Sequence, residues 1–299
     1  MLLAWSSAAY VVPLPPGHRF PMAKYRLIRD RVIDDGIIAE SRVLEPDRAR
    51  IEDVRLVHTE RYVHDIDTGH LDAADVRRLG FPWSPALVER SYRSVGGTVA
   101  ASRAALEHGV AINLSGGTHH AFADHGEGFC VFNDVAVAIR ALQHEDRVAR
   151  AVVVDLDVHQ GNGTNAIFAG DERVFTFSMH GAKNYPFHRM PGCVDIELPD
   201  GTGDDAYLEL LGGALPNALR AADAQLAVYL AGADVLAGDR LGRLGLTHAG
   251  VARRDALVLD ACRAIGLPVS IVLGGGYGAR LADTVDAHVQ TVRLAAAYA

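Results

Sequence analysis

The stretch that decides the fold is residues 151–164, which read AVVVDLDVHQGNGT. Its first half is a short, continuously apolar run, which is typical of a strand buried on both faces of a sheet. Its second half places Asp155, Asp157 and His159 directly after that strand. Carboxylates behind a buried strand need a cation or another partner. The stretch therefore predicts a parallel sheet, with either a metal site or solvated carboxylates and a helix cap at the end of one strand.

Other apolar runs of the same kind alternate with helical patterns along the chain. The predicted strands are 110–114, 151–156, 174–179, 225–231 and 268–273, and the predicted helices are 96–109, 130–143, 206–223, 247–265 and 279–299. Buried strands separated by helices indicate a parallel sheet covered on both faces. Residues 1–12 carry no basic residue and run into prolines, so they are interpreted as a first strand rather than a signal peptide. We expect one α/β domain over residues 1–299, with three α/β/α layers around a mainly parallel central sheet.

Composition and charge exclude several classes of protein. The 29 basic and 37 acidic residues give a net charge of −8, and the basic residues form no block, so direct nucleic-acid binding is not expected. No stretch approaches the ~20 apolar residues of a membrane span. The three cysteines, Cys130, Cys193 and Cys262, are too widely spaced for a disulfide framework or a zinc ribbon. They favour a reducing compartment, so we expect a cytoplasmic protein.

Polar side chains follow five of the predicted strands at the carboxyl end, which is the edge where parallel sheets bind ligands. They are His119 and His120, the pair Asp157 and His159 with Asp155, the residues Ser178 to His180, Asp234, and Tyr277. Asp157, His159 and Asp234 could supply two carboxylates and an imidazole and leave coordination positions open. That donor set is typical of a catalytic zinc site. The alternative, solvated carboxylates and a helix cap, does not account for the other strand ends.

The remaining polar residues suggest acid–base chemistry. His119 and His120 follow a pair of glycines and could act as base and acid near neutral pH. Tyr277 follows three glycines and could donate a hydrogen bond to an oxyanion, or could simply pack. Cys130 is interpreted as a buried packing thiol rather than as a nucleophile. A nucleotide-binding loop is not favoured, because no GxGxxG or GxxxxGK[ST] follows the first strand.

These motifs together resemble the histone deacetylase family, which has an arginase-like metallohydrolase fold. The resemblance runs through LSGGTHHAF, GEGFCVFNDVAVAI, VVDLDVHQGNGT, TFSMH, GTGDDAY, AGADVLAGDRLGRLGLT and LGGGYG, in the order of the family, between residues 114 and 278. HQGNG and the N-terminal HRFPMAKY (residues 18–25) are similar to the class IV branch and its bacterial relatives. One departure is Asn162, where the family usually has an aspartate.

The resemblance implies a role for each site residue. Zn²⁺ would be held by Asp157, His159 and Asp234, with His119 and His120 beside its bound water and Tyr277 opposite. His119 would pair with Asp155, and His120 with Asn162. A structural K⁺ would bind the Asp155 and Ser178 side chains and the backbone carbonyls of Asp155, Asp157, His159 and Met179. Gly128 and Phe129 would line the tunnel for the acylated lysine.

The resulting hypothesis is a zinc-dependent amidohydrolase that removes an acyl group, with acetyl expected, from the ε-amino group of lysine in a protein or peptide. His120 or His119 would take the proton of the attacking water. Acetylpolyamines or other small acylated amines, and long-chain fatty acyl-lysine, are alternative substrates. Two further alternatives are a binuclear manganese ureohydrolase and a non-catalytic module that binds acyl-lysine. Neither is favoured, because no second set of bridging carboxylates is evident and no zinc ligand is lost.

Overall fold

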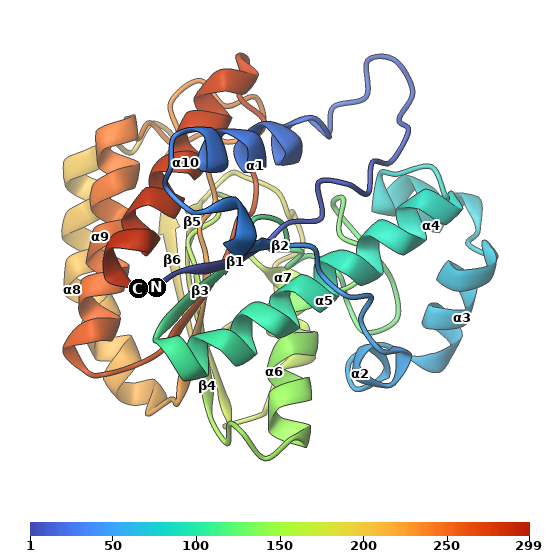
Figure 1. Cartoon of the computed structure of the whole chain (residues 1–299), viewed down its shortest axis with the longest axis horizontal. Helices are drawn as coiled ribbons and strands as arrows, with labels where there is room; N and C mark the ends of the chain where they lie inside the picture. Colours follow the sequence, from blue (N-terminus) through green and yellow to red (C-terminus); the bar gives the residue numbers. More distant parts are fainter.

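One eight-stranded sheet runs through the centre of the protein. A computed structural model describes all 299 residues, and Figure 1 shows the sheet between two layers of helices. The strand order is β2-β1-β3-β8-β7-β4-β5-β6, and every neighbouring pair is parallel. The strands are β1 (Leu3–Trp5), β2 (Val43–Leu44), β3 (Val110–Asn113), β4 (Ala151–Asp155), β5 (Val174–Gly181), β6 (Val194–Leu198), β7 (Leu226–Leu230) and β8 (Val269–Val272). The expected α/β class is confirmed.

Helices cover both faces of the sheet. One layer holds α1 (Lys24–Asp34), α8 (Asp204–Ala222), α9 (His248–Ala264) and α10 (Leu281–Tyr298). The other holds α5 (Pro85–His108) and α6 (Asp134–His144), with α7 (Asn162–Ile167) beside α6. Three short helices lie at the end of α5 in Figure 1: α2 (Ile51–Arg55), α3 (Glu60–Thr68) and α4 (Ala73–Leu79). A 3-10 turn spans Glu40–Arg42. None of the helices combines the length and the apolar character needed to cross a membrane.

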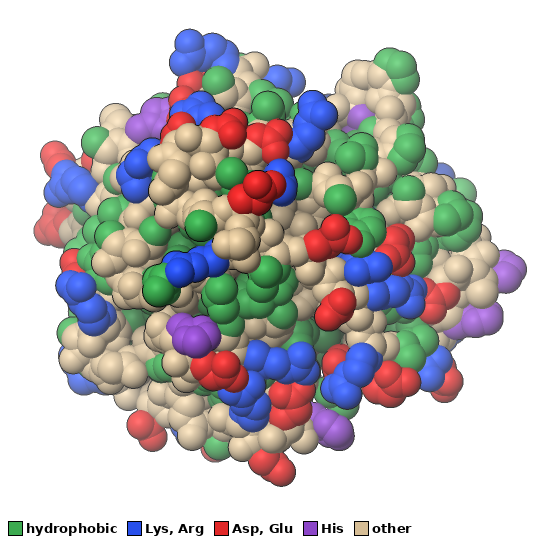
Figure 2. Space-filling view, in the orientation of Figure 1, with side chains coloured by type: hydrophobic (Ala, Val, Ile, Leu, Met, Phe, Trp, Pro, Cys, Tyr) green, Lys and Arg blue, Asp and Glu red, His purple; other side chains and the backbone are tan.

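The continuous apolar run of β4 follows from the packing of helices on both faces of the sheet. Val152 and Val154 pack into the core on the side of α8, α9 and α10, whereas Ala151 and Val153 pack into the core on the side of α5 and α6. Because successive strand residues face opposite sides, both sides of β4 must be apolar. The first charged residue, Asp155, stands where the strand ends. The outer surface is mixed, and Figure 2 shows basic and acidic side chains interspersed over one face.

The five strands predicted from apolar runs are present as β3, β4, β5, β7 and β8. The first strand is shorter than predicted, because only Leu3–Trp5 pairs with neighbours. Two strands were not predicted, and both lie at the edges of the sheet. β2 has only two residues, and β6 reads VDIEL, whose charged residues give no buried apolar run. Edge strands need less apolar sequence because one of their sides is open.

Two helix starts differ from the prediction, and a cap decides each. The helix expected from residue 96 begins at Pro85, because the Ser84 side chain accepts a hydrogen bond from the Leu87 amide. The helix expected from residue 130 begins at Asp134, because Asn133 caps it by accepting from the Ala136 amide. Cys130 therefore lies in a loop, not on a helix. Thr247 caps α9 by accepting a hydrogen bond from the Gly250 amide. The helices α1 to α4 and α7 were not predicted.

Candidate active site

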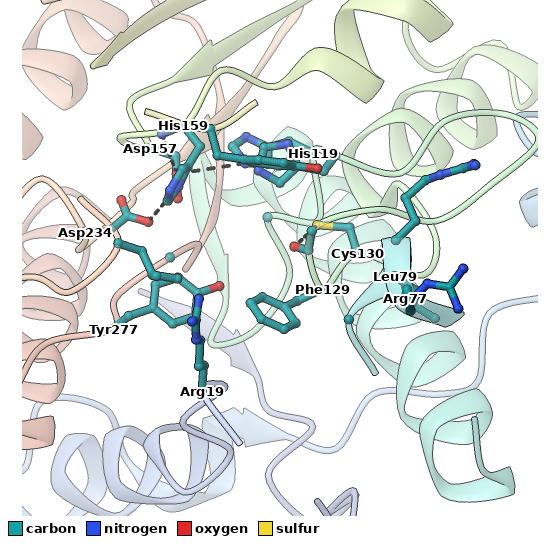
Figure 3. Close-up of a pocket in the computed structure, with 18 residues that line it drawn as sticks. Arg19, Arg77, Leu79, His119, Phe129, Cys130, Asp157, His159, Asp234 and Tyr277 are labelled. Atoms are coloured by element: carbon teal, nitrogen blue, oxygen red, sulfur yellow. Dashed lines mark hydrogen bonds and ion pairs between the residues drawn. The ribbon is translucent and has the colours of Figure 1, made fainter. Parts of the chain in front are cut away.

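The residues singled out from the strand ends converge on one pocket. β3, β8, β7, β4 and β5 are consecutive in the sheet, so their carboxyl ends lie along one stretch of its edge. The cavity there has a volume of about 320 Å³ (Figure 3). Its lining includes His119, His120, Gly128, Phe129, Asp157, His159, Asp234 and Tyr277.

Three side chains at the floor of the pocket could hold a metal ion. Asp157 and His159 follow β4, Asp234 follows the neighbouring β7, and one donor atom from each lies within 4.8 Å of the others. His159 Nδ1 is 2.9 Å from Asp157 Oδ1 and 3.3 Å from Asp234 Oδ2. Asp234 Oδ2 is buried and accepts no hydrogen bond, although such an oxygen normally has a partner. Two carboxylates and one imidazole match the charge and the donor preference of Zn²⁺.

A glycine turn closes over these ligands and carries Tyr277. At Gly275, φ is +57° and a Cβ would lie 2.0 Å from Asp234 Oδ2, so only glycine fits. The buried Lys24 Nζ donates a hydrogen bond to the Gly275 carbonyl, and the Tyr277 amide donates to Asp239 at 2.6 Å. Burial raises the pKa of the Tyr277 phenol well above its ordinary value. The hydroxyl therefore keeps its proton and remains a hydrogen-bond donor.

His119 and His120 have equal hydrogen-bond lengths but unlike partners. His119 Nδ1 lies 2.7 Å from Asp155 Oδ2, and His120 Nδ1 lies 2.7 Å from Asn162 Oδ1. Burial lowers the pKa of His119, but the charge of Asp155 and the hydrogen bond raise it more, to about 9. Burial lowers the pKa of His120 well below 6.5, and the charge of the neighbouring His119 lowers it further. The two environments thus push the pKa values of the two imidazoles apart, that of His119 upward and that of His120 downward.

The loop that carries the two histidines is held by Asp134, at the start of α6. Asp134 is fully buried and accepts hydrogen bonds from the backbone amides of Gly117 (3.1 Å) and Thr118 (2.7 Å). It also accepts from the Thr98 hydroxyl on α5 at 2.5 Å. Charge-assisted bonds of this kind are stronger than neutral ones. Asp134 therefore fixes the position of both histidines, a role that its place in an apolar helix did not predict.

Gly128 and Phe129 form one wall of the pocket in a left-handed conformation. Their φ angles are +55° and +67°, and a Cβ on Gly128 would lie 2.7 Å from His120 Cδ2. A non-glycine residue such as Phe129 rarely adopts a positive φ, and such positions cluster at functional sites. The Phe129 ring packs against Tyr277, with centroids 6.0 Å apart. Figure 3 shows Phe129 and Tyr277 across the pocket from His119.

Comparison with known proteins identifies the source of these motifs. Residues 18–292 match the histone deacetylase domain. The chain belongs to the histone deacetylase family. It is 34% identical to histone deacetylase 2 of Arabidopsis thaliana over 283 residues, which cover 90% of this chain and 73% of that protein. It is 46% identical to an uncharacterised protein of Picosynechococcus sp., with 93% of each chain covered.

Solved structures show the same fold. A histone deacetylase homologue complexed with SAHA superposes with a TM-score of 0.85 at 23% identity, covering 99% of this chain and 84% of the other. The HD domain of HDA15 gives a TM-score of 0.83 at 21% identity and covers 99% and 89%. The protein is therefore a deacetylase-family hydrolase with the arginase-like fold that its motifs indicated.

Several residues at the site of this deacetylase were not found from the sequence. Arg19, Arg77, Arg78, Tyr185 and Leu241 line the pocket, and Glu127 lies behind it against Asn162. Most of them stand in loops or on α4, outside the elements that periodicity reveals. The one available signal was the position of Glu127, directly before the conspicuous pair Gly128 and Phe129.

Two of the residues assigned to K⁺ lie on neighbouring strands, and one of them, Asp155, contacts His119. Asp155 on β4 and Ser178 on β5 are opposite each other in the sheet register. Asp155 also accepts a hydrogen bond from the Asp157 amide at 3.1 Å, and the Ser178 hydroxyl lies 2.9 Å from His180 Nδ1. Potassium at this place stays a prediction. Cys130 is buried, and burial raises the pKa of its thiol, so it lacks the thiolate that a nucleophile needs.

Proposed function

We propose that this deacetylase-family hydrolase is a zinc-dependent enzyme that removes the acetyl group from lysine ε-amino groups in proteins or peptides. Residues 1–299 would act as one catalytic domain. The observation that carries the proposal is the single pocket that joins a buried Asp–His–Asp donor set, two unlike histidines and a protonated tyrosine. Zinc bound by Asp157, His159 and Asp234 would polarise the amide carbonyl and acidify a water molecule.

The environments of the two histidines divide the proton transfers between them. The neutral His120 takes the proton of the attacking water, because only an imidazole with a free lone pair can act as a base. His119, held protonated by Asp155, supplies a proton to the leaving amine. The Tyr277 hydroxyl donates a hydrogen bond to the oxyanion as it develops. Pairs of titratable groups with pKa values pushed apart are the usual basis for such a division.

The charge of the pocket mouth favours acyl-lysine over acylated polyamines. Three exposed arginines, Arg19, Arg77 and Arg78, line the pocket, and its only carboxylates, Asp157 and Asp234, are buried at the proposed zinc site. Figure 3 shows Arg19 beside Tyr277, and Arg77 beyond Leu79. A polyamine carries further ammonium groups, which the guanidinium groups repel. A lysine in a neutral or acidic peptide avoids that repulsion.

A structural K⁺ belongs to the proposal as well. Asp155, which contacts His119, and Ser178 are opposite each other in the register of adjacent strands, and both are buried. Oxygen donors of this kind suit a hard cation. A cation there would help to keep Asp155 ionised beside His119.

The test is a turnover panel with zinc-loaded protein. Peptides that carry acetyl-, octanoyl- or myristoyl-lysine are compared with N-acetylputrescine and acetylspermidine. We expect the acetyl-lysine peptide to give the highest kcat/KM and the polyamines the lowest. A preference for a long acyl chain or for a polyamine would contradict the proposed substrate but leave the proposed amide hydrolysis in place. Zero turnover of every amide at full zinc occupancy would refute the proposal and favour a binding module.

A further inference from the structure

The side-chain amide of Asn162 lies between His120 and the carboxylate of Glu127. Asn162 Oδ1 lies 2.7 Å from His120 Nδ1, and Asn162 Nδ2 donates to Glu127 Oε1 at 3.0 Å. Glu127 also accepts a hydrogen bond from the Tyr185 hydroxyl. Asn162 is 1% exposed and the Glu127 side chain 17%. Neither residue lines the pocket, so both act from behind its wall.

The chemistry of a carboxylate decides which way the Asn162 amide points. An asparagine side chain can present its oxygen or its nitrogen to a given neighbour, whereas a carboxylate only accepts hydrogen bonds. Beside Glu127, the amide must therefore present its Nδ2, which turns Oδ1 toward His120. With Oδ1 as its partner, His120 Nδ1 must carry the proton. The neutral ring then has its lone pair on Nε2, the nitrogen that is not engaged by Asn162.

Without Glu127, nothing would fix which atom of the Asn162 amide faces His120. The amide of Asn162 could rotate and donate to His120 Nδ1, which would move the imidazole proton to Nε2 and remove the base. His119 needs no such device, because Asp155 contacts it directly. Tyr185 contacts both Glu127 and His120. Its hydroxyl donates to Glu127, and its ring packs edge-to-face on His120, with centroids 5.0 Å apart.

We propose that Glu127 is a positioning residue that acts through Asn162 to hold His120 in the Nδ1–H tautomer. The inference rests on the proposed function in one respect, the assignment of His120 as the base. It treats Glu127 and Asn162 as one unit that fixes the tautomer of the histidine, as a carboxylate in direct contact would, but without placing a negative charge against the ring. Tautomer control of this kind is the known use of a hydrogen-bond partner on a histidine.

The first experiment removes Glu127 in two backgrounds. Glu127→Ala in the natural sequence should lower kcat by about 10- to 100-fold, with KM changed little, as loss of such partners does elsewhere. Added to Asn162→Asp, the same substitution should not lower kcat below that of the Asn162→Asp variant alone. The introduced carboxylate accepts from His120 without help, and Glu127 would only repel it. An equal loss in both backgrounds would show that Glu127 serves the fold alone and would overturn the proposal.

The second experiment needs no substrate. Long-range ¹H–¹⁵N spectra of histidine-labelled, zinc-loaded protein report the tautomer of each ring, and the His120 signal is assigned by its loss in His120→Ala. We expect the Nδ1–H form in the natural protein and a signal shifted toward Nε2–H in Glu127→Ala. Tyr185→Phe is the matched control, because it removes the other bond of Glu127 and should leave the tautomer unchanged. An unchanged tautomer in Glu127→Ala would refute the inference even if acyl-lysine proves not to be the substrate.

Discussion

Exchanging the carboxylate and the amide behind His120 should reverse its protonation state at neutral pH. The variant combines Asn162→Asp with Glu127→Gln. It keeps the total charge and avoids two carboxylates in contact, since the two side chains are only 3.0 Å apart. The negative charge lies on Glu127 in the natural protein, and in the variant it moves to position 162, where the carboxylate contacts His120 directly.

His119 shows how far a carboxylate partner shifts the pKa of a buried histidine in this site. It is as buried as His120 and has a hydrogen bond of the same 2.7 Å, but to a carboxylate, and its pKa is raised from 6.5 to about 9. The pKa of His120 with its amide partner is lowered below 6.5. The exchange should therefore raise the pKa of His120 toward the value of about 9 that His119 has beside its carboxylate. Bound zinc lowers the pKa of both rings by its charge, so the difference between the variants is the quantity to compare.

The assay is the pH profile of kcat/KM, whose acidic limb reports the base of the free enzyme. A folded-state pKa that is raised keeps His120 protonated to higher pH, so the acidic limb should move to higher pH. Near pH 7 the rate should fall by roughly 100-fold if the pKa moves 2 units above that pH. Zinc content must match in both proteins. An acidic limb that stays in place, or moves to lower pH, would show that the partner of residue 162 is not the catalytic base.

Four further outcomes follow from the site. Asp234→Ala should abolish zinc binding and activity together, measured by elemental analysis and turnover, whereas full activity in metal-free protein would contradict the zinc assignment. Tyr277→Phe should lower kcat by about 10²- to 10³-fold with little change in KM, and an unchanged kcat would mean that the phenol only packs. Arg77→Glu should raise turnover of acetylspermidine relative to acetyl-lysine peptide severalfold at low salt, an effect that salt should weaken. Asp134→Ala should lower the free energy of unfolding in urea by about 2 kcal/mol or more, because the buried amide of Gly117 and the half-buried amide of Thr118 lose their acceptor. A loss below about 0.5 kcal/mol would argue against that anchor.

The central part of the fold could be predicted because burial on both faces leaves a strong local pattern. β4 is apolar up to Asp155 and β7 is apolar throughout, so their ends, and the side chains that follow, are visible in the sequence. The same reasoning places Asp157 and Asp234 at one edge of the sheet from the sequence alone. β6 has no such pattern, since it lies at the sheet edge and only its last residue is buried.

The parts of the site that could not be predicted depend on contacts between distant residues. Glu127 and Asn162 are 35 positions apart, and Tyr185 reaches Glu127 across 58 positions. No periodicity links such residues, and a lone glutamate in a glycine-rich loop is indistinguishable from a solvated one. Asp134 was overlooked for the opposite reason, because it begins an apolar helix whose pattern indicates only core packing.

The hydrogen bond from Lys24 to Gly275 joins residues 251 positions apart, and β1 inserts between β2 and β3 in the same region. During synthesis, the N-terminal segment emerges long before the glycine turn exists. Contacts of such separation form late, because a long loop must close before they stabilise anything. Until residue 275 arrives, the Lys24 ammonium must stay in water and α1 has no α10 to pack on. The glycine turn that carries Tyr277 is thus among the last parts of the protein to fold. A chain interrupted before this turn would leave the apolar face of α1 exposed to chaperones and proteases.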